Sequence, residues 1–304
     1  MAYKPRTESE ELMILRLLDT RMTLSEKDIQ HYYRLKKGYE GEVMFDSLTE
    51  KLQCECYILN DLLFKVNNTM FQIDTLIIVS DTVHFYEVKN YDGDYLYEID
   101  TDTLYKRPKK EYTNPLHQLN RSESLLRQLL QNIGYNFPIE AQVVFINPMF
   151  TLYQAPLERP FIFPTQVKSY LEKLDKVPSK LNRNCKTLAD KLISLHIDKN
   201  PYTTFPLYEY KGQRKGLICE LCNSFSIYVH GKKCVCGDCG HEELVSTAVL
   251  RNVREYMLLF PNQKITTNDI YDWCGGVVDS KKRISRILDR HFKIVGIGQW
   301  AYYE

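Results

Sequence analysis

The apolar positions along the chain change their period near residue 56. Before this point they recur at helical spacing, which predicts one helix over residues 8–19 and a longer helical stretch over residues 25–52. Gly38 and Gly41 interrupt the longer stretch, so two helices could meet there. After residue 56, short apolar runs alternate with turn residues, which is typical of strands. The expected strands cover 57–64, 71–79 and 83–89, followed by a ribbon over 94–105.

Helices and strands alternate again in the middle of the chain. Asn114 and Pro115 begin an amphipathic helix that Gly134 is expected to end. The fully apolar run over residues 141–146 suits a strand buried in a sheet. Two further helices are expected over 165–174 and 179–195, and the two prolines within 198–206 mark a domain boundary. This part of the chain therefore predicts an α/β domain.

The composition fits a soluble globular protein of two or three domains. The chain has 304 residues, of which 44% are hydrophobic and 26% are charged. Its net charge of +1 excludes a global basic field, so any surface for nucleic acid must be local. The sequence has no apolar run near the roughly 18 residues that span a membrane and no apolar core of a signal peptide. We therefore expect a cytoplasmic protein with no membrane partner.

Charged residues stand within two of the expected strands. Asp74 lies in a mostly apolar run, and Glu87 and Lys89 are two residues apart in the next strand. Side chains two apart share a face, and the short turn at 80–81 makes the strands antiparallel neighbours, so Asp74 should approach Glu87. Charges among apolar residues are costly unless they are paired or bind a metal. Two carboxylates and a lysine are the groups that metal-dependent phosphodiester hydrolysis needs.

Several short motifs surround these charged residues. In chain order they are Gly41-Glu42, Gln72-Ile73-Asp74, Glu87-Val88-Lys89-Asn90, Gly93 and Asn114-Pro115-Leu116-His117-Gln118. At these positions, over residues 38–146, the sequence resembles the nuclease-related (NERD) family of the PD-(D/E)xK, restriction-endonuclease-like superfamily. Ile73 stands where the superfamily signature has a proline, which is often absent.

The resemblance implies a fold, a metal and a set of roles. The fold would be a restriction-endonuclease-like mixed sheet flanked by helices. Asp74 and Glu87 would be ligands of Mg²⁺ or Mn²⁺, and Lys89 would act on the attacking water or the phosphate. Glu42 would aid the metal or Lys89 from the preceding helix, and Gln118 would line the cleft. The expected activity is hydrolysis of nucleic acid, with DNA as the expected partner.

Other interpretations of the charged residues stay open at this point. Asp74, Glu87 and Lys89 could form a salt-bridge ladder on a half-exposed sheet, or the fold could be a catalytically inactive regulator that binds nucleic acid. A protein-interaction subunit, with a protein partner or a homo-oligomer, is a third alternative that the near-neutral charge favours. His117 and the basic loop over 106–110, which includes Lys109, are weaker candidates for substrate contacts.

Five of the nine cysteines fall between residues 219 and 239. Two C-x₂-C pairs separated by thirteen residues are a strong signature of a zinc ribbon. The expected ligands of a structural Zn²⁺ are Cys219, Cys222, Cys236 and Cys239. Four thiolates leave no open coordination position, so the ion would support folding rather than catalysis. Cys234 lies two residues before Cys236 and could compete as a ligand, although the pair spacing favours Cys236.

The last segment has the layout of a winged helix-turn-helix. A helix is expected to start near residue 267, a second covers 281–292, and residues 294–303 read as a two-stranded wing. Ile284, Ile287 and Leu288 form the apolar stripe of the second helix. The expected nucleic-acid contacts beside that stripe are Lys281, Lys282, Arg283 and Arg286. Such a module also serves as a protein-interaction domain, so this alternative stays open.

The sequence as a whole predicts four parts. The expected limits are 1–30 for an N-terminal helical segment, 31–200 for the nuclease-like domain, 207–245 for the zinc ribbon and 246–304 for the winged-helix-like module. The last two parts would aid substrate binding.

Overall fold

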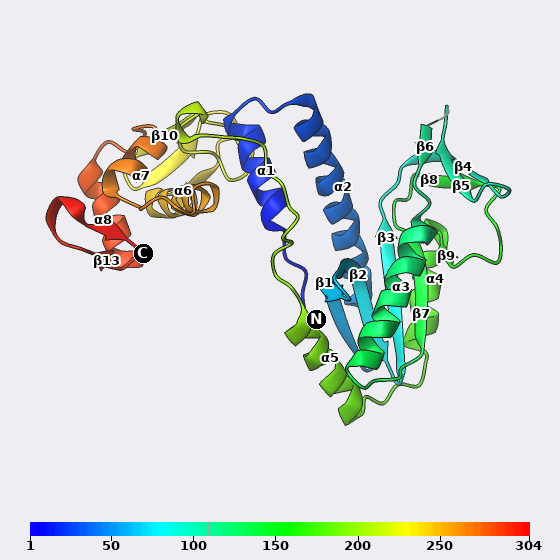
Figure 1. Cartoon of the computed structure of the whole chain (residues 1–304). Helices are drawn as coiled ribbons and strands as arrows, with labels where there is room; N and C mark the ends of the chain where they lie inside the picture. Colours follow the sequence, from blue (N-terminus) through cyan, green and yellow to red (C-terminus); the bar gives the residue numbers. More distant parts are fainter. Residues whose placement is uncertain (109) are drawn as a thin grey trace. The chain divides into compact units, whose positions relative to one another are not determined.

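A computed structural model describes residues 1–108 and 110–304 (Figure 1). The chain divides into two compact units. Unit 1 consists of Met1–Ser9 and Tyr33–Thr203, and unit 2 consists of Glu10–Tyr32 and Thr204–Glu304. The boundary between residues 203 and 204 lies inside the stretch where prolines indicate one. None of the helices in the described ranges is long and apolar enough to cross a membrane.

Unit 1 is built on a mixed five-stranded sheet in the order β1-β2-β3-β7-β9. The strands are β1 (Cys56–Val66), β2 (Thr69–Val79), β3 (Thr82–Lys89), β7 (Ile139–Phe145) and β9 (Phe161–Ile162). The first three are antiparallel neighbours, whereas β7 is parallel to both β3 and β9. The mixed α/β class and the expected strands are confirmed. Asn67 and Asn68 adopt φ values of 47° and 64° in the β1–β2 turn, where asparagine tolerates this conformation.

A smaller sheet lies between β3 and β9 in the sequence. Its strand order is β6-β5-β4-β8, with β4 (Gly93–Glu98), β5 (Thr103–Lys106), β6 (Lys110–Tyr112) and β8 (Phe150–Tyr153). β4 and β5 form the ribbon that the sequence predicts over residues 94–105.

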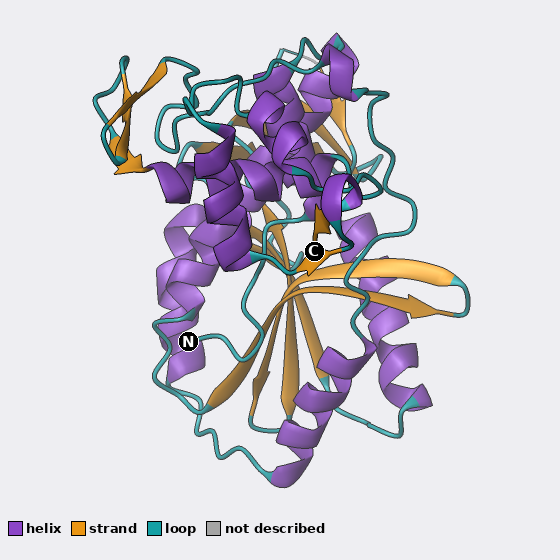
Figure 2. Ribbon diagram, turned by 90° about the vertical axis from the view of Figure 1, so that its left-hand side faces the viewer, coloured by secondary structure: helices purple, strands orange, loops and turns teal. Residues whose placement is uncertain are grey.

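Helices cover both faces of the five-stranded sheet (Figure 2). α3 (Pro115–Asn132) and α5 (Arg183–Leu195) contribute leucines to the core on one face. α2 (Glu26–Thr49) and α4 (Pro164–Asp175) cover the other face, where Phe45 and Leu171 pack on the strands. Burial of a side chain of this size contributes about 1.5–3 kcal/mol. The two cores therefore fix the sheet between its helices, as the restriction-endonuclease-like prediction requires.

The stretch that Gly38 and Gly41 interrupt is one continuous helix, α2, so the suggestion of two helices is wrong. Gly41 has a packing role instead. A Cβ atom at this position would lie 2.4 Å from Cβ of Asn90, which follows β3. The missing side chain therefore allows α2 to pass close to the end of β3.

Unit 2 combines a short ribbon with helices. The ribbon consists of the antiparallel strands β10 (Ile227–His230), β11 (Lys233–Cys236) and β12 (Glu242–Leu244). It is followed by α6 (Val245–Leu259), α7 (Thr267–Trp273), α8 (Lys281–His291) and the paired strands β13 (Ile294–Val295) and β14 (Tyr302–Tyr303). Short 3₁₀ turns cover Tyr210–Gly212 and Gly298–Trp300. Helix, turn, helix and wing thus follow in the expected order.

The N-terminal helix α1 (Glu10–Arg21) belongs to unit 2, whereas residues 1–9 belong to unit 1. Arg21 anchors α1. Its side chain is buried, its Nη2 lies 2.6 Å from Oε2 of Glu255, and its guanidinium stacks 4.1 Å from the ring centroid of Trp273. A buried cation needs such partners, so this contact holds α1 against α6 and α7.

Candidate functional site

The β2–β3 hairpin brings Asp74 and Glu87 to the same place. The last pair in its register is Thr75 with Tyr86, so the next residue of each strand is Asp74 and Glu87. At this point the backbone N–H of Val88 donates to Oδ2 of Asp74 at 2.8 Å. The main chain of β3 therefore orients the carboxylate of β2, and the approach expected from the short turn is observed.

Glu87 and Lys89 lie on one face of β3, as their spacing predicts. Lys89 donates from Nζ to Oε1 of Glu87 at 2.5 Å and to Oε1 of Gln118 at 3.2 Å. Tyr86 precedes Glu87 in the strand and points to the other face of the sheet, where it packs in the core with α2 and α4. The structure thus gathers Gln118, from the start of α3, with the two charged residues.

Glu87 has the features of a metal ligand. Its side chain is 1% exposed, and its Oε2 is buried without a hydrogen-bond partner. Burial, and then the charge of Asp74, raises the pKa of Glu87 to about 8. A divalent cation would compensate both effects, and carboxylate oxygens are ligands that Mg²⁺ and Mn²⁺ accept. These residues therefore fit the group that the family resemblance implies.

The carboxylates of this site are not packed as a closed cage. Among the described residues, only four cysteines form a group of three or more ligand atoms that all lie within 4.8 Å of one another. A cation held by Asp74 and Glu87 would complete its shell with water or substrate oxygens, as Mg²⁺ commonly does.

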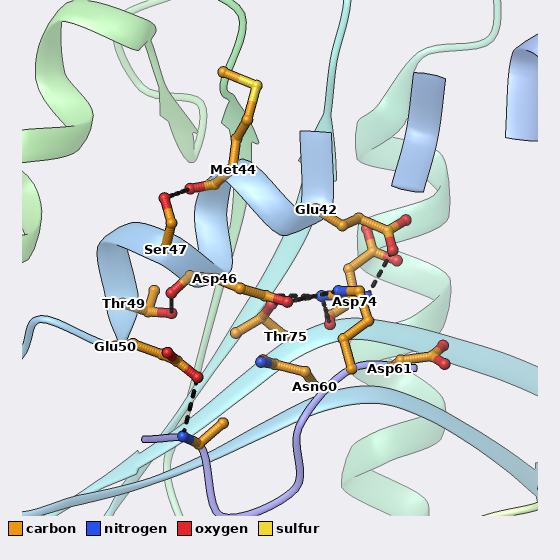
Figure 3. A network of polar contacts seen from close by, with 12 residues as sticks. Glu42, Met44, Asp46, Ser47, Thr49, Glu50, Asn60, Asp61, Asp74 and Thr75 are labelled. Atoms are coloured by element: carbon orange, nitrogen blue, oxygen red, sulfur yellow. Dashed lines mark hydrogen bonds and ion pairs between the residues drawn. The ribbon is translucent and has the colours of Figure 1, made fainter. Parts of the chain in front are cut away.

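Glu42 reaches the same region from α2. Its Oε2 lies 2.6 Å from Nη1 of Arg6, and its side chain is 19% exposed (Figure 3). Burial, and then Asp74, raises the pKa of Glu42 to about 8. Glu42 and the backbone carbonyl of Asp74 also accept from the same guanidinium, that of Arg6.

Sequence reasoning missed two further charged residues at the site. The Arg6 side chain is 3% exposed and contacts acids of α2, but nothing in its local sequence points to strands more than fifty residues away. Asp61 adopts a φ of 53° in the middle of β1, between the pairs Asn60–Thr75 and Leu62–Ile73. It thus lies opposite Asp74. An acid within the apolar run 57–64 was an available signal, like that of Asp74.

The acidic partners of His117 and of Lys106 lie outside β2 and β3. The His117 side chain is 62% exposed, and its Nε2 lies 3.2 Å from Oδ2 of Asp102. Lys106 pairs with Asp92 at 3.3 Å, and Lys109 lies outside the described residues. These contacts give no reason to prefer either feature over the cluster on the hairpin.

The predicted zinc ligands lie together. Sγ of Cys219 is 3.6 Å from Sγ of Cys239, and the same distance separates Sγ of Cys222 from Sγ of Cys236. A tetrahedral ion with Zn–S bonds of about 2.3 Å sets its sulfurs about 3.8 Å apart. Backbone N–H groups of Cys239 and Asp238 lower the pKa of Cys236 to about 7, which favours the thiolate that a metal needs. The cluster can therefore hold a metal ion.

Cys234 is not part of this cluster. It is 2% exposed and packs in the core of unit 2, and burial raises its pKa to about 11. It behaves as a small apolar residue.

The four basic residues expected to contact nucleic acid line α8 but differ in their surroundings. Lys282 and Arg286 are exposed. Lys281 donates to Oδ1 of Asn268 at 2.8 Å, and Arg283 donates to the carbonyl oxygen of Gly231 at 2.9 Å. Arg283 therefore links α8 to the turn of the ribbon, whereas Lys281, Lys282 and Arg286 are all exposed to solvent.

Comparison with known proteins adds one finding. No curated protein and no solved structure matches the chain. Residues 37–146 match the family model described as the nuclease-related domain, NERD. The matched range includes Glu42, the β2–β3 hairpin and the start of α3, which are the elements that form the cluster. The part of the chain that holds Asp74, Glu87 and Lys89 therefore lies within the range that matches a nuclease-related domain.

Proposed function

We propose that the protein is a metal-dependent nuclease that hydrolyses phosphodiester bonds of DNA with Mg²⁺ or Mn²⁺. The observation that carries this proposal is the buried and unpartnered Oε2 of Glu87, next to Asp74 and Lys89. A buried carboxylate oxygen without a donor is costly in a purely structural ion pair. This oxygen is therefore the atom that would coordinate a cation.

Each residue of the cluster has a distinct role in this proposal. Asp74 and Glu87 would hold the cation, which when bound activates water and offsets charge on the phosphate. Burial lowers the pKa of Lys89, but Glu87 and Asp74 more than offset this effect and the pKa is raised overall. Lys89 is therefore protonated at neutral pH and donates to the water or to the phosphate oxygens. Gln118 would orient Lys89, and Glu42 would assist from α2.

A cleavage assay with one variant tests the proposal. Wild type with Mg²⁺ or Mn²⁺ is expected to cut plasmid or single-stranded DNA, and Asp74→Asn to lose at least about 10²-fold of that activity, because the isosteric amide cannot replace a charged ligand. Binding of the same DNA should survive the substitution.

The control for this assay is wild type without added Mg²⁺ or Mn²⁺, which should not cleave although the far-UV circular dichroism of the chain stays unchanged. Folded wild type that cuts none of these substrates with either cation would overturn the proposal. DNA binding without cleavage by either protein would leave the inactive regulator as the function.

We further propose that the ribbon holds structural Zn²⁺ and that α8 contacts the phosphate backbone. Net charge is +1 over the whole chain, so binding must use local basic surfaces such as Lys282 and Arg286. The role of Zn²⁺ would be to fold the ribbon, whose turn accepts the hydrogen bond of Arg283.

Neutralising two of the exposed cations of α8 is expected to weaken DNA binding. Lys282→Gln with Arg286→Gln should reduce the slope of log K against log salt concentration by about 0.9 for each phosphate that α8 no longer neutralises. Fluorescence anisotropy over a salt series measures this slope. Arg254→Gln, at an exposed position of α6, is the matched control and should leave the slope unchanged. An unchanged slope in the double variant would exclude Lys282 and Arg286 as phosphate contacts.

A protein-interaction role is the second candidate function. The connection between β13 and β14 exposes Ile297 and Trp300, with exposed fractions of 91% and 78%. Large apolar side chains at a wing tip suit a protein partner. Weak DNA binding that does not respond to salt would favour this role over the nuclease.

A further inference from the structure

We propose that Arg6 is a positioning residue of the active centre, which makes residues 1–9 a working part of the nuclease-related unit. Arg6 would hold Glu42 and the backbone of Asp74 in the arrangement that binds the cation. This inference rests on the proposed nuclease function. Residues 1–9 lie outside the matched range 37–146, and the sequence motifs assign them no task.

The segment before Arg6 is fixed to the free edge of the sheet. The N–H groups of Tyr3 and Lys4 donate to the carbonyl oxygen of Ile58 at 2.8 Å and 3.1 Å, and the N–H of Asn60 donates to that of Lys4 at 2.9 Å. Lys4 also donates from Nζ to the carbonyl oxygens of Asn60 and Asp61, both at 2.7 Å. The main-chain bonds set the register of the segment on β1, and hence the position from which Arg6 extends.

The Arg6 side chain uses its planar guanidinium to join α2 and β2 to the N-terminal segment. Nε and Nη2 donate to the two carboxylate oxygens of Asp46 at 2.8 Å and 3.1 Å, and Nη1 donates to Glu42 at 2.6 Å. Nη2 also lies 2.7 Å from the carbonyl oxygen of Asp74 and 3.3 Å from Oγ1 of Thr75. Figure 3 shows Glu42, Asp46, Asp74 and Thr75 converging on this point. With 3% of the side chain exposed, the contacts are shielded from water.

This geometry gives Arg6 a defined task. Glu42 and Asp46 are four residues apart on α2, so they share a helix face and would repel each other without a cation between them. The bond to the Asp74 carbonyl fixes the backbone of the residue that would present a metal ligand. Loss of a bond that orients a metal ligand from outside the coordination shell usually lowers metal affinity by about 10–100-fold. Arg6 has no contact with the Glu87 oxygen left for the cation, so it acts through other residues.

Two physical effects of removing Arg6 have opposite signs. If Arg6 merely balanced charge, its loss would increase the negative potential and tighten the binding of a divalent cation. If Arg6 positions Glu42 and Asp74, its loss would let both move and would weaken binding. The direction of the change in Mn²⁺ affinity therefore distinguishes a positioning role from simple charge balance.

The test is Mn²⁺ binding by the purified full chain, followed by the electron paramagnetic resonance signal of free Mn²⁺. Arg6→Met is expected to raise the Mn²⁺ dissociation constant by about 10–100-fold and to raise the Mn²⁺ concentration for half-maximal cleavage by a similar factor. Arg6→Lys should fall between wild type and Arg6→Met, because an ammonium cannot reproduce the planar fork on Asp46.

Lys4→Met is the matched control. It removes a cation from the same segment and breaks contacts with backbone carbonyls, but leaves the main-chain bonds to β1 and all carboxylate contacts of Arg6. Its Mn²⁺ affinity should stay within about threefold of wild type, a small fraction of the effect of losing an orienting bond.

The outcomes separate this inference from the proposed function. If wild type cleaves DNA and folded Arg6→Met binds Mn²⁺ as tightly as wild type or more tightly, the positioning role of Arg6 is overturned, but the nuclease proposal is not. Wild type that neither binds Mn²⁺ nor cleaves overturns the nuclease proposal. If circular dichroism shows Arg6→Met to be unfolded, Asp46→Ala is measured in its place. This variant removes the carboxylate that accepts from Nε and Nη2 of Arg6 but keeps Arg6 itself. Wild-type Mn²⁺ affinity in that variant would also overturn the positioning role.

Discussion

Replacing Lys89 with methionine is expected to lower kcat by about 10²–10³-fold, which is the usual effect of removing one donor aimed at developing charge. Lys89 carries the cationic group that lies against both Glu87 and Gln118. Methionine keeps much of the length and apolar stem of lysine but cannot donate to water or phosphate. Single-turnover cleavage with saturating Mn²⁺ and DNA measures the effect on chemistry, and DNA affinity should change little because the ammonium donor serves the transition state.

Folding must be measured in the same samples. Lys89 is the partner of a buried carboxylate, and removing one member of such a pair can cost about 3–5 kcal/mol. Thermal unfolding with Mn²⁺ present shows whether the cation compensates for the missing ammonium. Lys65→Met, at an exposed position of β1, is the control for loss of one positive charge. If folded Lys89→Met has a kcat near that of wild type, Lys89 has only a structural role, as the ion-pair partner of Glu87.

The sequence predicts the hairpin at the centre of the site because local rules determine it. Apolar runs define the two strands, and the short turn at 80–81 sets the register that places Asp74 next to Glu87. Alternation then places Glu87 and Lys89 on one face. The C-x₂-C pairs are equally local, and the structure brings all four cysteines together.

The residues that sequence reasoning missed depend on contacts between distant segments. Arg6 reaches acids of α2 because the N-terminal segment is fixed to the edge of β1, and edge pairing leaves no spacing pattern to detect. The continuity of α2 also depends on a distant contact, because Gly41 faces Asn90 rather than ending a helix. Asp61 needs a positive φ within a strand, and propensity disfavours that conformation for residues other than glycine.

The division of the N-terminus has a similar origin. Residues 1–9 follow the sheet of unit 1, whereas α1 packs in unit 2 through Arg21, Glu255 and Trp273. Neither contact can be seen in the local pattern. The expected limits of the four parts stay a prediction, which limited proteolysis of the purified chain can test.

Removing zinc is expected to unfold the ribbon of unit 2. The three strands of the ribbon are only three or four residues long, so they cannot bury enough apolar surface to fold alone. Structural zinc sites supply about 10–16 kcal/mol of apparent binding energy to such modules. Cys236→Ser should lower the zinc content from one ion per chain to well below one, and lower the midpoint of thermal unfolding. Atomic emission for zinc and differential scanning calorimetry measure the two effects.

Cys234→Ala is the matched control, because Cys234 lies two residues from Cys236 on the same strand but packs in the core. Cys234→Ala should keep one zinc ion per chain, and its stability should fall only by the packing contribution of one sulfur atom. The damage from Cys236→Ser should extend beyond the ribbon, since Ile227 and Val229 of β10 pack with the helices of unit 2. Loss of zinc in Cys234→Ala, or full zinc content in Cys236→Ser, would show that the fifth cysteine is a ligand and that the predicted set is wrong. The opposite pair of results would establish a closed four-thiolate site, which has no open position for substrate and therefore leaves catalysis to the carboxylates of unit 1.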